Sequence, residues 1–70
     1  MTDEKKLELI KTYIDDIKEY ELSHNWSLNK KQDIRRALDA YQSLYEDAEK
    51  GRIDLDLLHE NITSFMYMLQ

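Results

Sequence analysis

Apolar residues recur along this chain at the spacing of amphipathic α-helices. The first series is Leu7, Ile10, Ile14 and Ile17, in which the members lie three or four residues apart. Because each residue advances about 100° around an α-helix, this spacing places the four side chains on one face. The pattern predicts a helix over residues 3–24.

Two further segments repeat the alternation of three and four residues. The apolar positions are Ile34, Leu38, Tyr41, Tyr45 and Ala48 in the second segment, and Leu55, Leu58, Ile62, Phe65 and Leu69 in the third. Each series again follows one face of a helix. They predict helices over residues 29–50 and 55–69.

Residues that commonly begin and end helices stand at these boundaries. Ser27 or Asn29 is the expected N-cap of the second helix, and Asn29 with Gln32 fits a capping box. Gly51 stands where a left-handed residue commonly ends a helix, and Asp54 is the expected N-cap of the third. The predicted connections are therefore only a few residues long.

Short connections between helices make sequential neighbours antiparallel. We therefore expect an all-α fold in one domain over residues 1–70. Its predicted architecture is a three-helix bundle, in which an antiparallel helical hairpin is followed by a third amphipathic helix across its open face. The alternative is a long two-helix hairpin whose third helix is devoted to dimerisation.

The distribution of charge supports the hairpin independently of the apolar pattern. The net charge of −5 divides into −3 over residues 1–25, +3 over residues 26–37 and −5 over residues 38–70. The first two helices both carry their basic residues early and their acidic residues late, so antiparallel packing places acid opposite base at both ends. An exposed pair contributes only about 0–1 kcal/mol, so this pattern selects orientation more than it adds stability.

The composition excludes several chemistries. The 70 residues contain no Cys, no Pro and one Gly, which excludes disulfides, cysteine-based zinc sites and glycine-rich phosphate loops. The chain has no Gly-x-Ser-x-Gly motif, and a bundle this small has little room for a substrate cavity of about 300 Å³. We therefore expect no enzymatic activity and no cofactor.

The apolar faces are wider than a small core requires. A helix needs an apolar stripe of roughly 100°, whereas the first two helices span about 160° and the third about 180°. We expect a 70-residue chain to leave part of this surface exposed, and exposed apolar patches mark interfaces. The alternative is that the additional apolar residues thicken a monomeric core.

The surplus of apolar surface predicts a small acidic, non-enzymatic protein that regulates or interacts with a partner protein. We expect that it also self-associates as a homodimer. The third helix is the expected contact surface, with contributions from the first helix and the first connection. The candidate partner-binding residues are Trp26, Leu57, Phe65, Met66, Tyr67, Met68, Tyr13 and Tyr20.

Two of these aromatic residues have specific expectations. Trp26 lies in the first connection, where it either closes the open end of the bundle or enters a pocket of the partner, since Trp and Tyr are enriched among interface hot spots. Tyr67 falls on the polar side of the third helix. It is therefore expected to be exposed.

A nucleic-acid-binding regulator is the first alternative function. The basic start of the second helix contains Gln32, Arg35 and Arg36, side chains that can contact phosphates or base edges. The acidic residues on either side would repel DNA. The expectation is therefore that these cations neutralise the acidic end of the first helix and that nucleic acid is not a partner.

A helical metalloprotein is the second alternative. Glu21 and His24, like Asp56 and His59, stand three residues apart, and Glu-x-x-His recurs in the di-metal sites of helical bundles. Such a site needs further carboxylates from opposing helices, and a chance pairing is easy in a chain with 15 acidic residues. We therefore expect no metal ligand among these four residues.

No apolar run approaches the roughly 20 residues that a membrane-spanning helix requires. The charged residues near the start are not followed by the apolar stretch of a secretory signal. The expected location is therefore the cytoplasm, without membrane contact.

Overall fold

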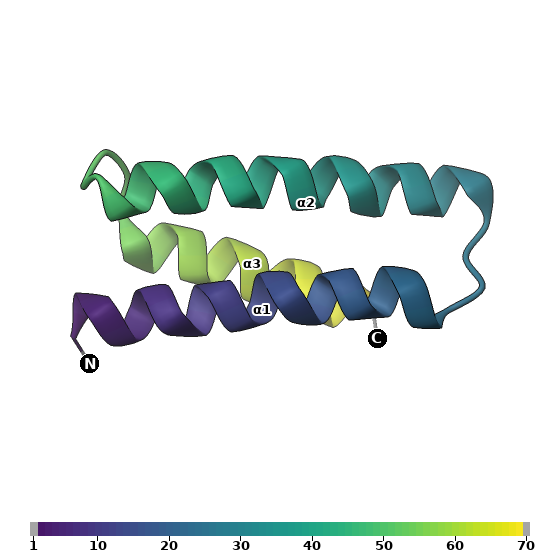
Figure 1. Ribbon diagram of the computed structural model, residues 1–70, viewed down its shortest axis with the longest axis horizontal. Helices are drawn as coiled ribbons and strands as arrows, with labels where there is room; N and C mark the ends of the chain where they lie inside the picture. Colours follow the sequence, from purple (N-terminus) through teal and green to yellow (C-terminus); the bar gives the residue numbers. More distant parts are fainter. Residues whose placement is uncertain (1, 70) are drawn as a thin grey trace.

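The computed structural model describes residues 2–69 and contains three helices and no strand within that range. The helices are α1 (Asp3–Ser23), α2 (Leu28–Glu49) and α3 (Leu55–Leu69). α2 runs antiparallel to α1, and α3 returns in the direction of α1 (Figure 1). The predicted all-α three-helix bundle is thus confirmed, with helix ends within one residue of those expected.

Short polar side chains begin all three helices. The hydroxyl oxygens of Thr2 and Ser27 accept hydrogen bonds from the backbone N–H groups three residues later, each at 3.3 Å. The Asp54 carboxylate accepts from the backbone N–H of Asp56 at 2.9 Å. These oxygens satisfy donors that a helix leaves free in its first turn. Of the two N-caps that the sequence offered for α2, Ser27 is confirmed, and Asn29 lies inside the helix because α2 begins at Leu28.

The turn between α2 and α3 is a Schellman motif centred on Gly51, which has φ of 74°. Its N–H donates to the Ala48 carbonyl at 3.1 Å, and the N–H of Arg52 donates to the Asp47 carbonyl at 2.9 Å. This left-handed conformation favours glycine, as the sequence predicted. The turn satisfies carbonyls at the end of α2 and directs the chain back along the hairpin.

The core consists of apolar side chains from all three helices. Its members are Ile10, Ile14, Ile17, Ile34, Leu38, Tyr41, Ala48, Leu58, Ile62 and Leu69. Among residues 2–69 no polar or charged residue other than tyrosine is buried. Burial of a side chain as large as isoleucine contributes about 1.5–3 kcal/mol, so this cluster is the main stabilising element of the fold.

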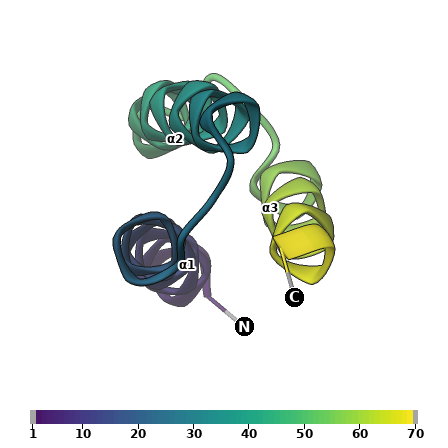
Figure 2. The same cartoon turned by 90° about the vertical axis from the view of Figure 1, so that its right-hand side faces the viewer.

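The three helices surround this core (Figure 2). α1 packs extensively against both other helices, whereas α2 and α3 contact each other much less. The third helix therefore covers the open face of the hairpin as expected, with most of its contact made to α1. Because Ile62 of α3 is fully buried, the alternative of a two-helix hairpin with a separate third helix is excluded.

α3 is shorter than the hairpin, with 15 residues against 21 in α1 and 22 in α2. It therefore ends before reaching the connection between α1 and α2 (Figure 1). Trp26, in that connection, packs against the core and is half-buried. One aromatic side chain thus covers part of the end that α3 does not reach.

Ion pairs support the predicted orientation at one end of the hairpin. Nε of Arg35, near the start of α2, donates to Oε1 of Glu21, near the end of α1, at 2.7 Å. At the other end, Lys6 of α1 lies 2.6 Å from Asp56 of α3. The ion pair at this end therefore joins α1 to the third helix, while Glu49 of α2 lies beside Lys6 and Lys11 around two neighbouring hollows.

Within residues 2–69, no helix combines the length and the apolar character needed to cross a membrane.

Candidate protein-binding surface

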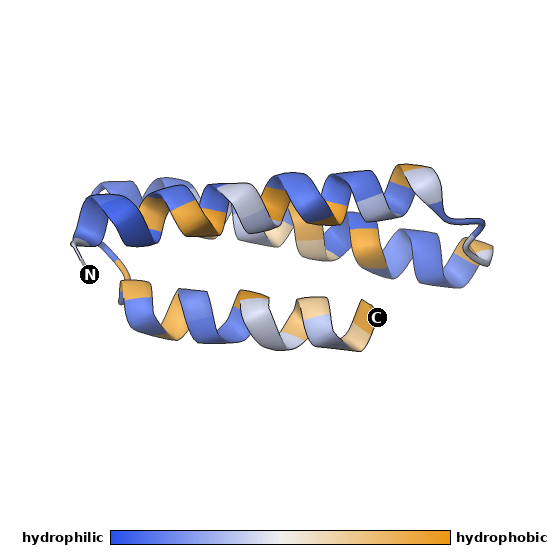
Figure 3. Ribbon diagram, turned by 90° about the horizontal axis from the view of Figure 1, so that it is seen from below, coloured by the Kyte–Doolittle hydropathy of each residue, from blue (hydrophilic) through white to orange (hydrophobic). Residues whose placement is uncertain are grey.

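The surface of α3 combines large apolar side chains with high exposure. Leu57, Tyr67 and Met68 are 66%, 74% and 73% exposed. Phe65 and Met66 are half-buried and pack against the core. Figure 3 shows apolar segments recurring along α3 between hydrophilic ones, whereas hydrophilic colour predominates in the ribbons of the hairpin. Of the large apolar side chains that are exposed within residues 2–69, three lie on α3 and two, Leu22 and Leu28, lie elsewhere. Phe65 and Met66 of the predicted set are turned toward the core.

A groove of about 270 Å³ lies between α2 and α3. Leu57 forms one wall and Leu44 of α2 forms the opposite wall. The complete lining is Leu44, Ile53, Asp54, Leu57, Leu58 and Asn61. Met68 stands eleven residues after Leu57, so the two side chains point in directions that differ by only about 20° around the helix axis. Leu57 and Met68 therefore share the flank of α3 that faces α2.

Aromatic side chains account for the separation of α2 and α3. The rings of Tyr41 and Phe65 meet edge to face, with centroids 5.7 Å apart. The Tyr41 hydroxyl donates to Oδ1 of Asn61 at 3.0 Å, and burial raises the pKa of this phenol. Side chains of this length keep the two backbones apart, because their rings fill the space that closer helices would occupy. The groove is the surface consequence of this wide spacing.

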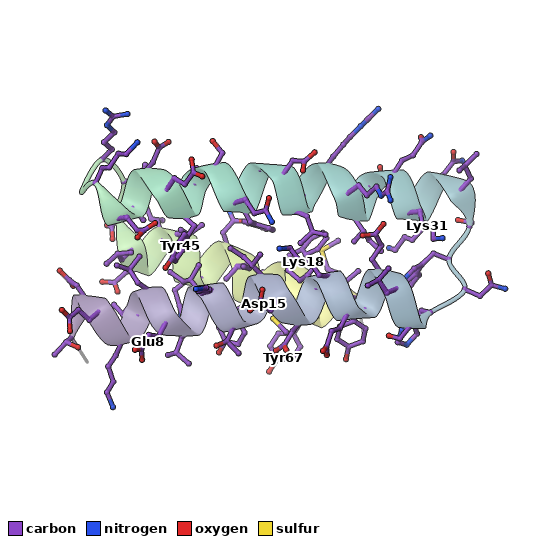
Figure 4. The ribbon with its side chains drawn as sticks, viewed as in Figure 1. Glu8, Asp15, Lys18, Lys31, Tyr45 and Tyr67 are labelled. Atoms are coloured by element: carbon purple, nitrogen blue, oxygen red, sulfur yellow. The ribbon has the colours of Figure 1, made fainter. Side chains whose placement is uncertain are left out.

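The opposite flank of α3 faces α1 and carries the exposed aromatic residue Tyr67. Tyr67 lies beside Tyr13, Thr63 and Met66 around a shallow hollow of about 210 Å³. Figure 4 shows Tyr67 at the edge of the molecule beyond α1, while Tyr45 and Lys18 lie between α1 and α2. The expected exposure of Tyr67 is confirmed. Tyr67 and Leu57 therefore project from different flanks of the same helix.

Two further predicted residues of α1 lie along this flank. The Tyr13 ring packs against His59, with centroids 5.7 Å apart, and Tyr20 lines a second hollow with Met66. Both tyrosines are half-buried. The eight predicted residues thus divide between two flanks of α3 and the end of the hairpin, so they do not form one continuous surface.

Trp26 lies at that end and is held by its own contacts. Its indole N–H donates to the carbonyl of Tyr20 at 2.9 Å, which satisfies an acceptor in the last turn of α1. His24 stacks between the rings of Trp26 and Tyr20, with centroid distances of 5.2 Å to each. Of the two predictions for Trp26, these contacts agree with the one in which it closes the open end of the bundle.

The basic start of α2 is partly engaged within the molecule. Arg35 pairs with Glu21, whose side chain is only 11% exposed. Arg36 and Lys31 are exposed. The pairing of Arg35 agrees with the expectation that these cations neutralise the acidic end of α1.

The two histidines have apolar or aromatic surroundings. His24 lies outside α1, with extended dihedral angles of −113° and 147°, because the helix ends at Ser23. The expectation that Glu21 and His24 share a helix face was therefore wrong. Within residues 2–69, no three His, Asp or Glu side chains are grouped so that they could hold a metal ion.

The electrostatic character of α3 is acidic. The helix contains Asp56 and Glu60 but no Lys or Arg, and Asp54 caps its start. The hydrogen bond from Lys6 and the charge of its ammonium group lower the pKa of Asp56. The same hydrogen bond raises the pKa of Lys6. The last turn of α3 contains no basic residue to offset the partial negative charge of the helix C-terminus.

Of the residues that line the groove, only Leu57 belongs to the predicted set. The other five were absent from it: Leu44, Ile53, Asp54, Leu58 and Asn61. Leu44 flanks the apolar stripe of α2, Ile53 lies in the turn, and Asn61 is polar. One feature of the sequence could have indicated Asn61: it stands four residues before Phe65, on the same side of the helix. This position directs the Asn61 amide toward a neighbouring helix. Sequence periodicity did not indicate which neighbour that would be.

In comparisons with known proteins, no family model, curated protein sequence or solved structure matches this chain.

Proposed function

We propose that this small acidic protein acts by binding another protein through α3, without catalysing a reaction. The observation that carries the proposal is the high exposure of Leu57, Tyr67 and Met68 on one 15-residue helix. Large apolar side chains gathered on one exposed element are typical of interaction surfaces in soluble proteins.

The distribution of exposed apolar residues supports this choice of surface. Leu22 and Leu28 are also exposed, at the end of α1 and the start of α2. Neither lines the groove between α2 and α3, and individual exposed leucines are ordinary on protein surfaces. α3 in contrast combines three such residues with a neighbouring apolar groove.

Site-specific photo-crosslinking in the source cells tests the proposal. A photoreactive amino acid replaces Leu57 or Tyr67 in separate variants, and Leu22, which is 84% exposed, serves as the matched control position. We expect discrete protein adducts from positions 57 and 67 that are absent at position 22. Identical adduct patterns from all three positions would contradict a binding surface on α3.

Self-association is the second part of the proposal and has its own test. Sedimentation equilibrium at micromolar concentration should give a mass above that of the 8.5 kDa chain. If α3 forms the contact, Tyr67→Gln should weaken the association, whereas Leu22→Gln should not. A homogeneous monomer of 8.5 kDa would remove the homodimer and leave the binding of another protein to the crosslinking experiment.

A further inference from the structure

The groove between α2 and α3 has the dimensions of a site for protein side chains. Its volume of about 270 Å³ lies below the roughly 300–1,000 Å³ of typical small-molecule pockets. Its two walls are helices, one provided by Leu44 and the other by Leu57. An apolar groove between two helices commonly receives the apolar face of a third helix, whose side chains enter at intervals of three or four residues.

The α2 wall continues beyond the groove along one helical stripe. Asp33, Ala37, Ala40, Leu44 and Asp47 follow one another at spacings of four and three residues, so they share a flank of α2. Ala37 and Ala40 are small, so another helix can approach this part of α2 closely. Asp47 stands at the end of the stripe nearest the groove, whereas Asp33 at the other end lies within the basic start of α2.

The charges around the groove favour a cationic partner. Asp54 lies in the lining, Asp47 and Asp33 end the α2 stripe, and α3 has no Lys or Arg. Arg52, 3.8 Å from Asp47, and Arg36, one turn before Ala40, offset part of this charge. At the groove itself the carboxylates of Asp47 and Asp54 outnumber Arg52, and residues 38–70 as a whole carry −5.

We propose that this groove binds an amphipathic helix of a cationic partner, a specification that rests on the proposed function. The apolar residues of the partner enter between Leu44 and Leu57, and its Lys or Arg side chains face Asp47 and Asp54. A second copy of this chain fits this groove less well, because contact through the Leu57 flank would place two helices without basic residues against each other. The proposed self-association therefore uses the Tyr67 flank and not the groove.

Synthetic peptides provide the test. Three helical peptides share one leucine stripe and carry lysine, glutamine or glutamate on their flanks, and fluorescence anisotropy measures their binding to the full chain. We expect the lysine peptide to bind most tightly and the glutamate peptide most weakly. The affinity for the lysine peptide should fall as salt concentration rises, because screening weakens exposed charge interactions.

Matched variants locate the peptide. Leu57→Gln should weaken binding of the lysine peptide about 5- to 10-fold, corresponding to loss of about 1–1.4 kcal/mol at one apolar contact. Leu22→Gln should leave it unchanged, since Leu22 is exposed on the distant end of α1. Asp47→Asn should weaken binding about 2- to 5-fold, as expected for one partly screened charge, and Asp15→Asn on α1 serves as its control.

Three outcomes would overturn this inference. The first is equal affinity for the lysine and glutamate peptides, and the second is an equal loss in the Leu57 and Leu22 variants. The third is a homodimer that Leu57→Gln dissociates, which would identify a second copy as the occupant. Specific crosslinks from position 57 without a preference for lysine would refute the cationic partner and leave the proposed function intact.

Discussion

The two flanks of α3 meet the rest of the bundle in different ways. Toward α1 the contact is extensive, and the Tyr13 ring lies against His59 while Lys6 pairs with Asp56. Toward α2 the contact is limited and passes through long side chains, with Tyr41 reaching Phe65 and Asn61. One helix therefore has a closed flank and an open one.

This difference follows from side-chain shape more than from polarity. The buried face of α1 consists of Ile10, Ile14 and Ile17, whereas the centre of the buried face of α2 is Tyr41. Short branched side chains let helices approach closely, while an aromatic ring between them requires a wider spacing. An apolar pattern alone thus determines that a face is buried, and the size of its residues determines whether a groove remains beside it.

Ile62 contributes to both flanks, so its truncation should have the largest effect. The side chain is fully buried, and Ile62→Ala should lower the free energy of unfolding by about 2–5 kcal/mol through lost burial and a residual cavity. Domains of this size have only about 4–10 kcal/mol in total. Urea denaturation followed by circular dichroism measures the change.

The matched variant is Leu57→Ala, on the same helix but 66% exposed. It should change the free energy of unfolding by less than about 0.5 kcal/mol. Equal losses in the two variants would mean that the open flank of α3 is packed as tightly as its buried face, which contradicts the comparison.

The Gly51 turn sets the direction in which α3 leaves α2. At φ of 74° a Cβ atom would meet nothing within 4 Å, so the effect of Gly51→Ala comes from backbone strain and not from a clash. We expect the free energy of unfolding to fall by about 1–2 kcal/mol. Gly51→Asn is the control and should cost less, because asparagine tolerates the left-handed region. Equal costs for both substitutions would contradict this explanation.

The hydrogen bond from Tyr41 to Asn61 is the polar link across the open flank. Tyr41→Phe removes a hydroxyl that donates to Oδ1 of Asn61, and it should lower the free energy of unfolding by about 0.5–1.5 kcal/mol. Tyr45→Phe is the control, since the Tyr45 hydroxyl has no hydrogen bond within residues 2–69. A double-mutant cycle with Asn61→Ala isolates the interaction, and a coupling energy near zero would show that the link adds no stability.

The sequence predicted most of the fold because the fold depends on local signals. Apolar periodicity located three helices, and Gly51 and Asp54 marked the turn that joins the last two. The sequence left Ser27 and Asn29 open as N-caps of α2, and the structure selects Ser27. Competition between nearby polar side chains of this kind is not resolved by their identities.

The candidate surface could be predicted only in part. The width of the apolar face on α3 indicated that residues such as Leu57 and Met68 would exceed the needs of a small core, and the position of Tyr67 on the polar side indicated its exposure. Neither signal could assign these residues to flanks. That assignment depends on how far α3 lies from each neighbour, and the ring of Tyr41 sets that distance on one side. The groove at Leu44 therefore follows from a tertiary contact that periodicity does not contain.

The smallest expected effect concerns the ion pair on the closed flank. The hydrogen bond and charge of Lys6 lower the pKa of Asp56 below its ordinary 3.8. Because the folded pKa is the lower one, the stabilisation is present above pH 3.8 and disappears as pH falls through the folded value. The pKa of Lys6, the other member of the pair, is raised above 10.5. The stabilisation that Lys6 contributes is therefore present below that pH and disappears as pH rises through its folded pKa.

Titration of the Asp56 carboxyl by NMR measures this effect directly. In Lys6→Gln its pKa should rise toward the ordinary value, whereas Lys5→Gln, at an exposed neighbouring position, should leave it nearly unchanged. An unaltered pKa in Lys6→Gln would show that the pair does not form in solution. Because Asp56 is exposed, the free energy of unfolding near neutral pH should hardly change even when the pair is lost. The close approach of α1 and α3 would then depend on their apolar side chains, as the comparison of the two flanks requires.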